Sequence, residues 1–133
     1  MTPDDICAWF EREGLALERL RDNLSRTRVR AGERAFPLVV HFDERWVGLA
    51  IVPLVRLPPD PDDAERLMVR LLGLNREMNL AKFSVDDDGD VVLSVDWLLA
   101  ALAPTQLRDA LDALAFYADR HHAEIEALAS SAA

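Results

Sequence analysis

The residues best suited to bind a metal ion form an acid-rich run, Asp86-Asp87-Asp88-Gly89-Asp90. A calcium loop of the helix–loop–helix type spreads oxygen ligands over about twelve residues, ends with a bidentate Glu and is flanked by helices. Counted from Asp86, that last position is Trp97, and both flanks of the run alternate as strands do. An Asp-Gly pair between alternating segments is typical of a β-hairpin, because glycine adopts positive φ without steric cost. We therefore predict a turn here and no metal ion.

The other groups capable of chemistry are isolated from one another. The adjacent His121 and His122 would project about 100° apart on a helix, so they cannot hold one ion from one side. Cys7 lies in an apolar helical segment, and the sequence has neither a nucleophile elbow nor a glycine-rich phosphate loop. We expect no catalytic residue, no cofactor and no enzymatic activity. A single cysteine cannot form an internal disulfide and favours a cytoplasmic location.

Composition indicates one soluble globular domain over residues 1–133, with 50% apolar and 29% charged residues. The net charge of −9 argues against direct binding to nucleic acid or to an anionic membrane, because such binding rests on clustered Lys and Arg. It would suit a partner protein with a basic segment, but an acidic surface commonly serves solubility alone, and both interpretations stay open. No apolar run is long enough to cross a bilayer.

The first third of the chain predicts one helix followed by strands. Thr2 and Pro3 mark the start of the helix, and Gly14 is a natural terminator. Residues 15–26 fit either a helix or a short extended piece with a turn, and we favour the extended piece. Three strands then follow, at Thr27 to Ala31, Ala35 to Phe42 and Trp46 to Val52. The third is apolar on both faces, which indicates a central strand or an interface, and we expect Pro53 to end it.

The second half of the chain predicts a helix, a hairpin and a long final helix. Asp60 or Asp62 can cap the first of these helices. Its expected apolar face consists of Ala64, Leu67, Met68, Leu71, Leu72 and Asn75. The hairpin strands are Leu80 to Val85 and Val91 to Val95. The resulting order, α-β-β-β-α-β-β-α, predicts an α+β fold with helices packed on an antiparallel sheet of about five strands.

The final helix favours a homodimer. From Pro104 to Ala129 it would measure about 39 Å at about 1.5 Å per residue, which exceeds the width of a domain of this size. Its apolar stripe continues through Ile125 and Leu128, so we expect a second subunit to cover these side chains. The candidate residues of the dimer or partner interface are Trp46, Trp97, Tyr117, Ile125 and Leu128.

Several short segments between Phe36 and Arg120 resemble the YbjN-like family, bacterial proteins labelled sensory transduction regulators. They are Leu74-Asn75-Arg76, Ala81-Lys82-Phe83-Ser84, Asp86 to Gly89, Val91-Val92-Leu93 and the helix that begins at Pro104. The family's fold is similar to that of type III secretion chaperones. The resemblance implies this fold, homodimerisation and non-catalytic binding of protein segments.

The resemblance also singles out five motif positions, which we interpret as structural: Asn75, Lys82, Phe83, Asp86 and Gly89. Asn75 would satisfy backbone groups near a helix end, Phe83 would pack in the core, and Gly89 would form the turn.

The leading functional hypothesis is a chaperone-like, adaptor or regulatory module that binds segments of a partner protein. Edge strands and apolar grooves accept extended peptides by strand addition or in side-chain pockets. The alternative is a regulatory domain that responds to a small molecule or a metal ion bound between sheet and helices.

Overall fold

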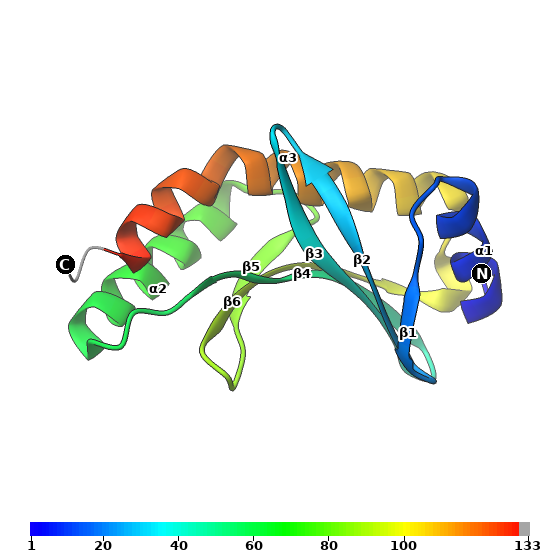
Figure 1. Cartoon of the computed structure of the whole chain (residues 1–133), viewed down its shortest axis with the longest axis horizontal. Coiled ribbons are helices and arrows are strands. Elements are labelled where there is room, and N and C mark those ends of the chain that lie inside the picture. Colours follow the sequence, from blue (N-terminus) through cyan, green and yellow to red (C-terminus); the bar gives the residue numbers. More distant parts are fainter. Residues whose placement is uncertain (131–133) are drawn as a thin grey trace.

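A computed structural model of the chain describes residues 1–130 as a twisted sheet with helices on one side of it (Figure 1). In chain order the elements are α1 (Pro3–Arg12), β1 (Glu18–Arg21), β2 (Leu24–Ala31), β3 (Arg34–Phe42), β4 (Trp46–Arg56), α2 (Pro61–Glu77), β5 (Lys82–Val85), β6 (Asp90–Leu98), the 3₁₀ turn η1 (Leu99–Ala101) and α3 (Pro104–Ala129). The predicted α+β class is confirmed, with six strands in place of about five. The sixth is β1, which is the short extended piece expected within residues 15–26.

The strands lie in the order β1-β2-β3-β4-β6-β5, and all neighbouring strands are antiparallel. Short turns join β1 to β4 as a meander. The chain then leaves the sheet through α2, returns as β5 and finishes with β6 between β4 and β5. β1 and β5 are therefore the two edge strands.

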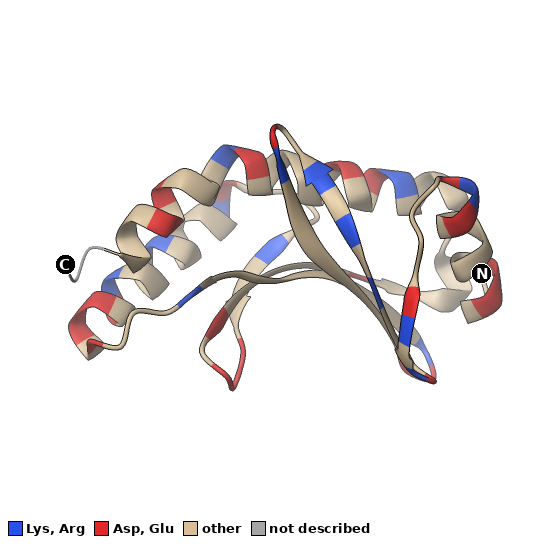
Figure 2. Cartoon of the chain, in the orientation of Figure 1, with Lys and Arg blue, Asp and Glu red and all other residues tan. Residues whose placement is uncertain are grey.

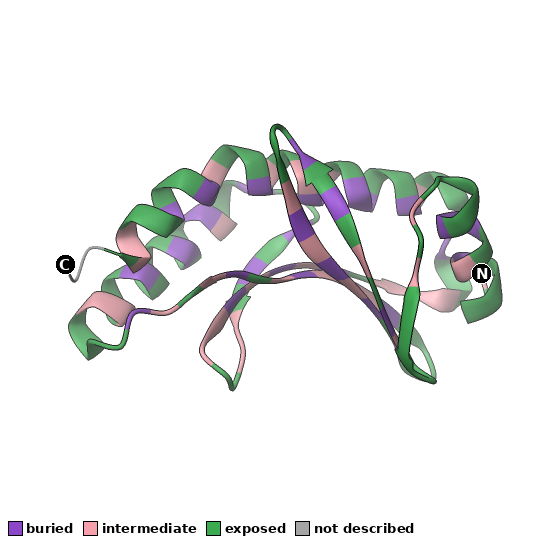
Figure 3. Ribbon diagram, in the orientation of Figure 1, coloured by how far each residue is buried: buried purple, intermediate pink, exposed green. Residues whose placement is uncertain are grey.

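One continuous core lies between the sheet and the helices. α3 runs across the face of the sheet, with α1 near its first turns and α2 beside its C-terminal half (Figure 1). Alternate strand residues point toward α3, and Figure 3 shows the alternation as bands of buried and partly buried residues. The largest fully buried side chains include Ile6 and Phe10 of α1, Leu38, Leu49, Ile51 and Leu93 of the sheet, and Leu107 and Leu114 of α3.

The helix caps are those that the sequence predicts. The Thr2 hydroxyl accepts the backbone N–H of Asp5 at 3.1 Å, and the Asp5 carboxylate accepts the N–H of Thr2 at 2.9 Å. Asp60 caps α2 by accepting the N–H of Asp63 at 3.1 Å. Each bond satisfies a backbone group that has no partner within the helix, which fixes where the helix begins.

Two predictions about element boundaries and faces were wrong. β4 does not end at Pro53 but continues to Arg56, because the pairing with β6 shifts register between Ile51 and Val55 and so accommodates a residue that has no N–H. The buried side of α2 carries Leu67, Leu71 and Leu74, whereas Met68 and Leu72 of the expected apolar face are exposed. α2 lies at the end of the sheet, so only a narrow stripe of it touches the core.

The expectation that a second subunit must cover Ile125 was also wrong. Ile125 is fully buried within its own chain. The C-terminal half of the long α3 is partly shielded from solvent because α2 packs beside it. The Arg70 guanidinium of α2 pairs with the Glu124 carboxylate of α3 at 2.6 Å. Leu128 is partly buried and packs against the same core.

Candidate protein-binding surface

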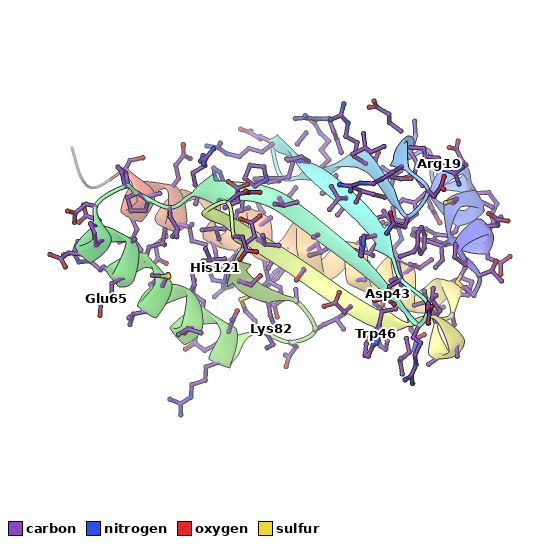
Figure 4. The ribbon with its side chains drawn as sticks, turned by 90° about the horizontal axis from the view of Figure 1, so that it is seen from below. Arg19, Asp43, Trp46, Glu65, Lys82 and His121 are labelled. Carbon is purple, nitrogen blue, oxygen red and sulfur yellow. The ribbon has the colours of Figure 1, made fainter. Side chains whose placement is uncertain are left out.

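The face of the sheet opposite α3 is not covered by any helix of residues 1–130. Figure 4 looks onto this open face, with α3 behind the strands. Its centre consists of small or apolar side chains that are half-buried by their neighbours: Ala35, Pro37, Val39, Ala50, Val52 and Val92. Cross-strand pairing makes the patch continuous, because Val39 lies opposite Ala50 and Ala50 lies opposite Ser94. Contiguous apolar patches on a protein surface, when large enough, mark sites of interaction with other molecules.

One side of the open face is bordered by arginines. Arg26, Arg28 and Arg30 alternate along β2, where Figure 2 shows a row of blue bands, and their strand partners are Val39, Pro37 and Ala35. The Arg26 guanidinium pairs with the Glu18 carboxylate at 2.9 Å. Arg28 donates to the backbone oxygen of Ala35 at 3.2 Å. The apolar centre therefore has a basic margin, although the chain as a whole is acidic.

The β5 edge of the sheet is closed by one side-chain amide. The Asn75 Nδ2 donates to the Phe83 carbonyl at 2.9 Å, and its Oδ1 accepts the Phe83 N–H at 2.7 Å. The Lys82 ammonium donates to the Asn75 carbonyl in the last turn of α2, at 2.9 Å, and also to the carbonyl of Met78, the residue that follows the helix. Asn75 thus takes the place that another strand would occupy beside Phe83.

The other edge is open over part of its length. β1 pairs only with Leu24, Ser25 and Arg26, so the remaining residues of β2, Thr27 to Ala31, have no strand on their outer side among those described. A hollow of about 670 Å³ lies beside this free edge, between the chain that leads from α1 into β1 and the strands β2 and β3. Gly14, Leu15 and Ala16 line one wall, and Arg28 and Pro37 line the other.

A second exposed surface runs along α2 and is called the α2 stripe below. It consists of Glu65, Val69, Leu72 and Arg76, at spacings of four, three and four residues, which place them on one side of a helix. Val69 and Leu72 are 62% and 69% exposed. Arg66 and Arg70 have carboxylate partners within the chain, but none is recorded for Glu65 or Arg76 among residues 1–130. The stripe therefore presents two apolar side chains between two unpaired opposite charges.

The aromatic and apolar residues proposed as an interface from sequence do not form one surface. Trp46, which is 44% exposed, and Trp97 lie on the neighbouring strands β4 and β6. Tyr117 is on α3, where its hydroxyl accepts the N–H of Asn79 at 3.0 Å and its ring stacks on His121. Figure 4 shows Trp46 far from Glu65 of the α2 stripe, which lies near one end of the molecule. The sequence analysis identified neither the α2 stripe nor the arginines of β2. The alternation in Arg26-Thr27-Arg28-Val29-Arg30 predicts that these three arginines share one face of a strand.

The acidic run at Asp86 to Asp90 and Cys7 are the groups whose residue types could bind a metal ion or act as a nucleophile, and both are part of the folded framework. Asp86 Oδ1 accepts the N–H groups of Asp88 and Asp90 at 3.0 and 2.9 Å, and Gly89 has φ of +79°, so the acid run forms the hairpin turn. Burial raises the pKa of the Cys7 thiol, which favours its neutral form. Residues 1–130 contain no group of three His, Cys, Asp or Glu side chains that could hold a metal ion. No helix in that range is long and apolar enough to cross a membrane.

The two histidines of α3 should make the fold sensitive to mild acid. Burial, with a smaller effect of Arg34, lowers the pKa of His122 below its ordinary value of 6.5, while Glu126 raises it; burial also lowers the pKa of His121. The unfolded chain therefore takes up protons near pH 6.5 that the folded chain does not, and stability falls as the pH drops below that value. Urea titrations between pH 8 and pH 5 should show this loss.

His122→Gln should reduce the loss, because it removes a buried imidazole whose protonation the fold opposes. An unchanged slope in His122→Gln would contradict the role assigned to this side chain.

Comparison with known proteins identifies the fold and the family of the chain. A chain of the heterodimeric ExoU–SpcU complex from the type III secretion system of Pseudomonas aeruginosa has a TM-score of 0.62 and 22% identity, covering 95% of this chain and 98% of its own. YbjN from E. coli has a TM-score of 0.64 and 11% identity, covering 93% of each chain. An uncharacterized protein from Methanothermobacter thermautotrophicus has a TM-score of 0.61 and 10% identity, covering 98% of this chain and all of its own.

These similarities show the type III secretion chaperone-like fold. No curated protein sequence matches the chain. The family model of YbjN, described as "Putative bacterial sensory transduction regulator", matches residues 2–127. Because that match spans nearly the whole sequence, the resemblance seen in the motif segments is confirmed, and the chain belongs to the YbjN family.

Proposed function

We propose that this protein is a non-catalytic, cytoplasmic protein-binding module of the chaperone or adaptor kind, which acts as a homodimer and holds an extended segment of a partner protein. The observation that carries the proposal is the open face of the sheet, with its half-buried apolar centre beside the free edge of β2. An extended segment needs main-chain partners and pockets for alternate side chains, and this surface offers both.

The comparisons support this direction. The ExoU–SpcU structure is a complex of two different proteins, so a chain with this fold does associate with a partner. At 22% identity the likeness concerns the fold alone, and the binding surface proposed here rests on the residues of this chain. The family description points to regulation, which is compatible with a module that works by binding another protein.

The α2 stripe supports the homodimer. If two copies of α2 pack antiparallel about a twofold axis between Val69 and Leu72, each Val69 meets the partner copy's Leu72. The same operation places Glu65 opposite Arg76 of the other copy, and both pairs occur twice. A twofold interface must be self-complementary in this way. The residue types and spacings of the stripe are compatible with this requirement.

An apolar hollow extends this surface toward the sheet. It measures about 210 Å³ and is lined by Met68, Leu71 and Leu72 of α2 and by Phe83 to Val85 of β5. Side chains of a second copy could fill it, which would add buried apolar area to the helix pair. This location replaces the interface around Ile125 that the sequence indicated.

Cross-linking in the native host tests the partner-binding proposal. A photo-reactive phenylalanine analogue at Val39, in the centre of the open face, should form an adduct with a discrete partner protein. The comparison position is Asp112 on α3, which is more exposed than the half-buried Val39 and faces away from the sheet. Adducts at Val39 and not at Asp112, mapped to one segment of the partner, are the expected result. Equal adducts at both positions, or none at Val39, would contradict binding at the open face.

A further inference from the structure

The free edge of β2 has the properties of a site for one kind of segment. We propose that residues Thr27 to Ala31 accept an extended, acidic segment of the partner protein as an additional strand, with its carboxylates beside Arg28 and Arg30. This inference rests on the proposed function and specifies both the place and the chemistry of the bound segment. It also reverses the expectation, drawn from the net charge of −9, that the partner segment is basic.

The location follows from the difference between the two edges of the sheet. At β5 the outward N–H and C=O of Phe83 already have partners in the amide of Asn75. At β2 the pairing with β1 ends at Arg26, and no bond from the chain between α1 and β1 to residues 27–31 is recorded. Outward backbone groups of an edge strand are a template for another strand. Of the two edges, the one at β2 is available.

The charge of the segment follows from the side chains around that edge. Residues 18–34 contain six arginines and three acidic residues, a local net charge of +3 within a chain of −9. Glu18 already pairs with Arg26 at 2.9 Å, and the long contact of Arg34 is with Glu126 at 3.9 Å. No carboxylate partner is recorded for Arg28 or Arg30 in the described chain. An added strand with acidic residues on the open-face side would supply these partners, since opposite charges on adjacent strands stabilise the pairing.

The side chains on the helix side of the free edge suggest what the other side of the segment carries. In an extended strand successive side chains point to opposite faces. Acidic residues facing Arg28 and Arg30 would alternate with residues that face the helix side of the sheet. There Thr27 of β2 is only partly buried, and Leu15 and Leu17 are partly buried apolar side chains that pack against the core. The expected segment therefore alternates acidic and apolar residues.

Fluorescence anisotropy with a synthetic peptide tests the inference. The probe is a labelled peptide alternating glutamate and valine, about nine residues long, which spans the free edge at about 3.4 Å per residue. Versions with glutamine or lysine in place of glutamate test charge, and a version with alternate amide nitrogens methylated tests strand pairing. We expect saturable binding of the glutamate peptide that weakens as salt rises, with the other three peptides at least about tenfold weaker.

Variants of the protein locate the site. Arg28→Glu combined with Arg30→Glu should reduce affinity for the glutamate peptide by about tenfold or more. The matched control is the combination of Arg45→Glu and Arg120→Glu, which makes the same change in net charge at exposed positions of the β3–β4 turn and of α3. Near-normal binding is expected for the control.

Several outcomes would overturn the inference. Equal binding of the methylated peptide would exclude strand addition, and equal weakening by the two pairs of variants would exclude this location. A thymidine oligonucleotide of the same net charge that bound as tightly as the glutamate peptide would identify the arginines as a nucleic-acid site. If Val39 captures a partner in cells whereas the glutamate peptide does not bind, the acidic strand is refuted and the proposed function stands.

Discussion

Leu72→Asp is expected to convert a dimer of twice the 14.9 kDa chain mass into a monomer, as measured by light scattering at micromolar concentration. In the proposed dimer each Leu72 lies against Val69 of the other copy, and burial of an exposed aliphatic side chain contributes about 1.5–3 kcal/mol. The substitution occurs twice per dimer, so the expected loss is about 3–6 kcal/mol, or about two to four powers of ten in the dissociation constant. Phe116→Asp is the matched control, because Phe116 is 56% exposed on α3 and lies outside the α2 stripe.

Charge exchange tests the twofold arrangement itself. Glu65→Arg alone, or Arg76→Glu alone, places like charges opposite each other across the axis and should weaken the dimer. The double variant restores opposite charges and should recover most of the lost affinity, a pattern that only a direct contact produces. A monomeric wild-type protein would refute the homodimer, and a dimer unaffected by Leu72→Asp would place its interface elsewhere.

Local sequence signals predicted much of the fold because they act within a few residues. Thr2 and Asp60 each satisfy a backbone N–H three positions later, and Gly89 supplies the positive φ of its turn. Such devices do not depend on the remainder of the chain. The short extended piece before β2 was also predicted, but not its place as an edge strand of the sheet, which is set by pairing with β2.

The errors arose where the neighbours of an element, rather than its own sequence, decide what is buried. Apolar residues occupy more than one side of α2, and the sequence does not reveal that the helix lies at the end of the sheet and exposes Leu72. Likewise α3 is too long for a small domain unless another element extends the core; α2 packs against α3, and Ile125 is fully buried within the chain. The aliphatic side chains left exposed are Val69 and Leu72 on α2, whereas Ile125 on α3 is fully buried.

For the candidate binding surface too, the local pattern could be predicted from the sequence, whereas its surroundings could not. Alternating arginines in β2 are visible in the sequence, and alternation predicts that they share one face of a strand. That this face has no helix over it, and that β1 stops before the end of β2, are consequences of topology. Net charge is a poor guide here because its acidic excess lies mainly on the helices and turns, as Figure 2 shows, whereas the local charge at the edge of β2 is positive.

The strongest effect on stability is expected from Asn75, because this one side chain joins α2 to the edge of the sheet. Both of its amide atoms bond to Phe83, at 2.9 and 2.7 Å, in a partly buried position. Asn75→Ala would leave a backbone N–H and a backbone C=O without partners, at a cost of about 1–3 kcal/mol for each unsatisfied group. For the two groups together we expect a decrease of about 2–6 kcal/mol in the free energy of unfolding, measured by urea titration.

Asn75→Leu separates the hydrogen bonds from the space that the side chain fills, since leucine has a similar size and cannot bond to Phe83. A loss comparable with that of Asn75→Ala, together with faster hydrogen exchange at the Phe83 amide, is the expected result. Asn23→Ala removes an exposed amide near His41 and should change stability by no more than about 0.5 kcal/mol. Wild-type stability and exchange in Asn75→Leu would mean that water replaces the amide without cost. The β5 edge would then be open too, and the preference for β2 as the site of strand addition would lose its basis.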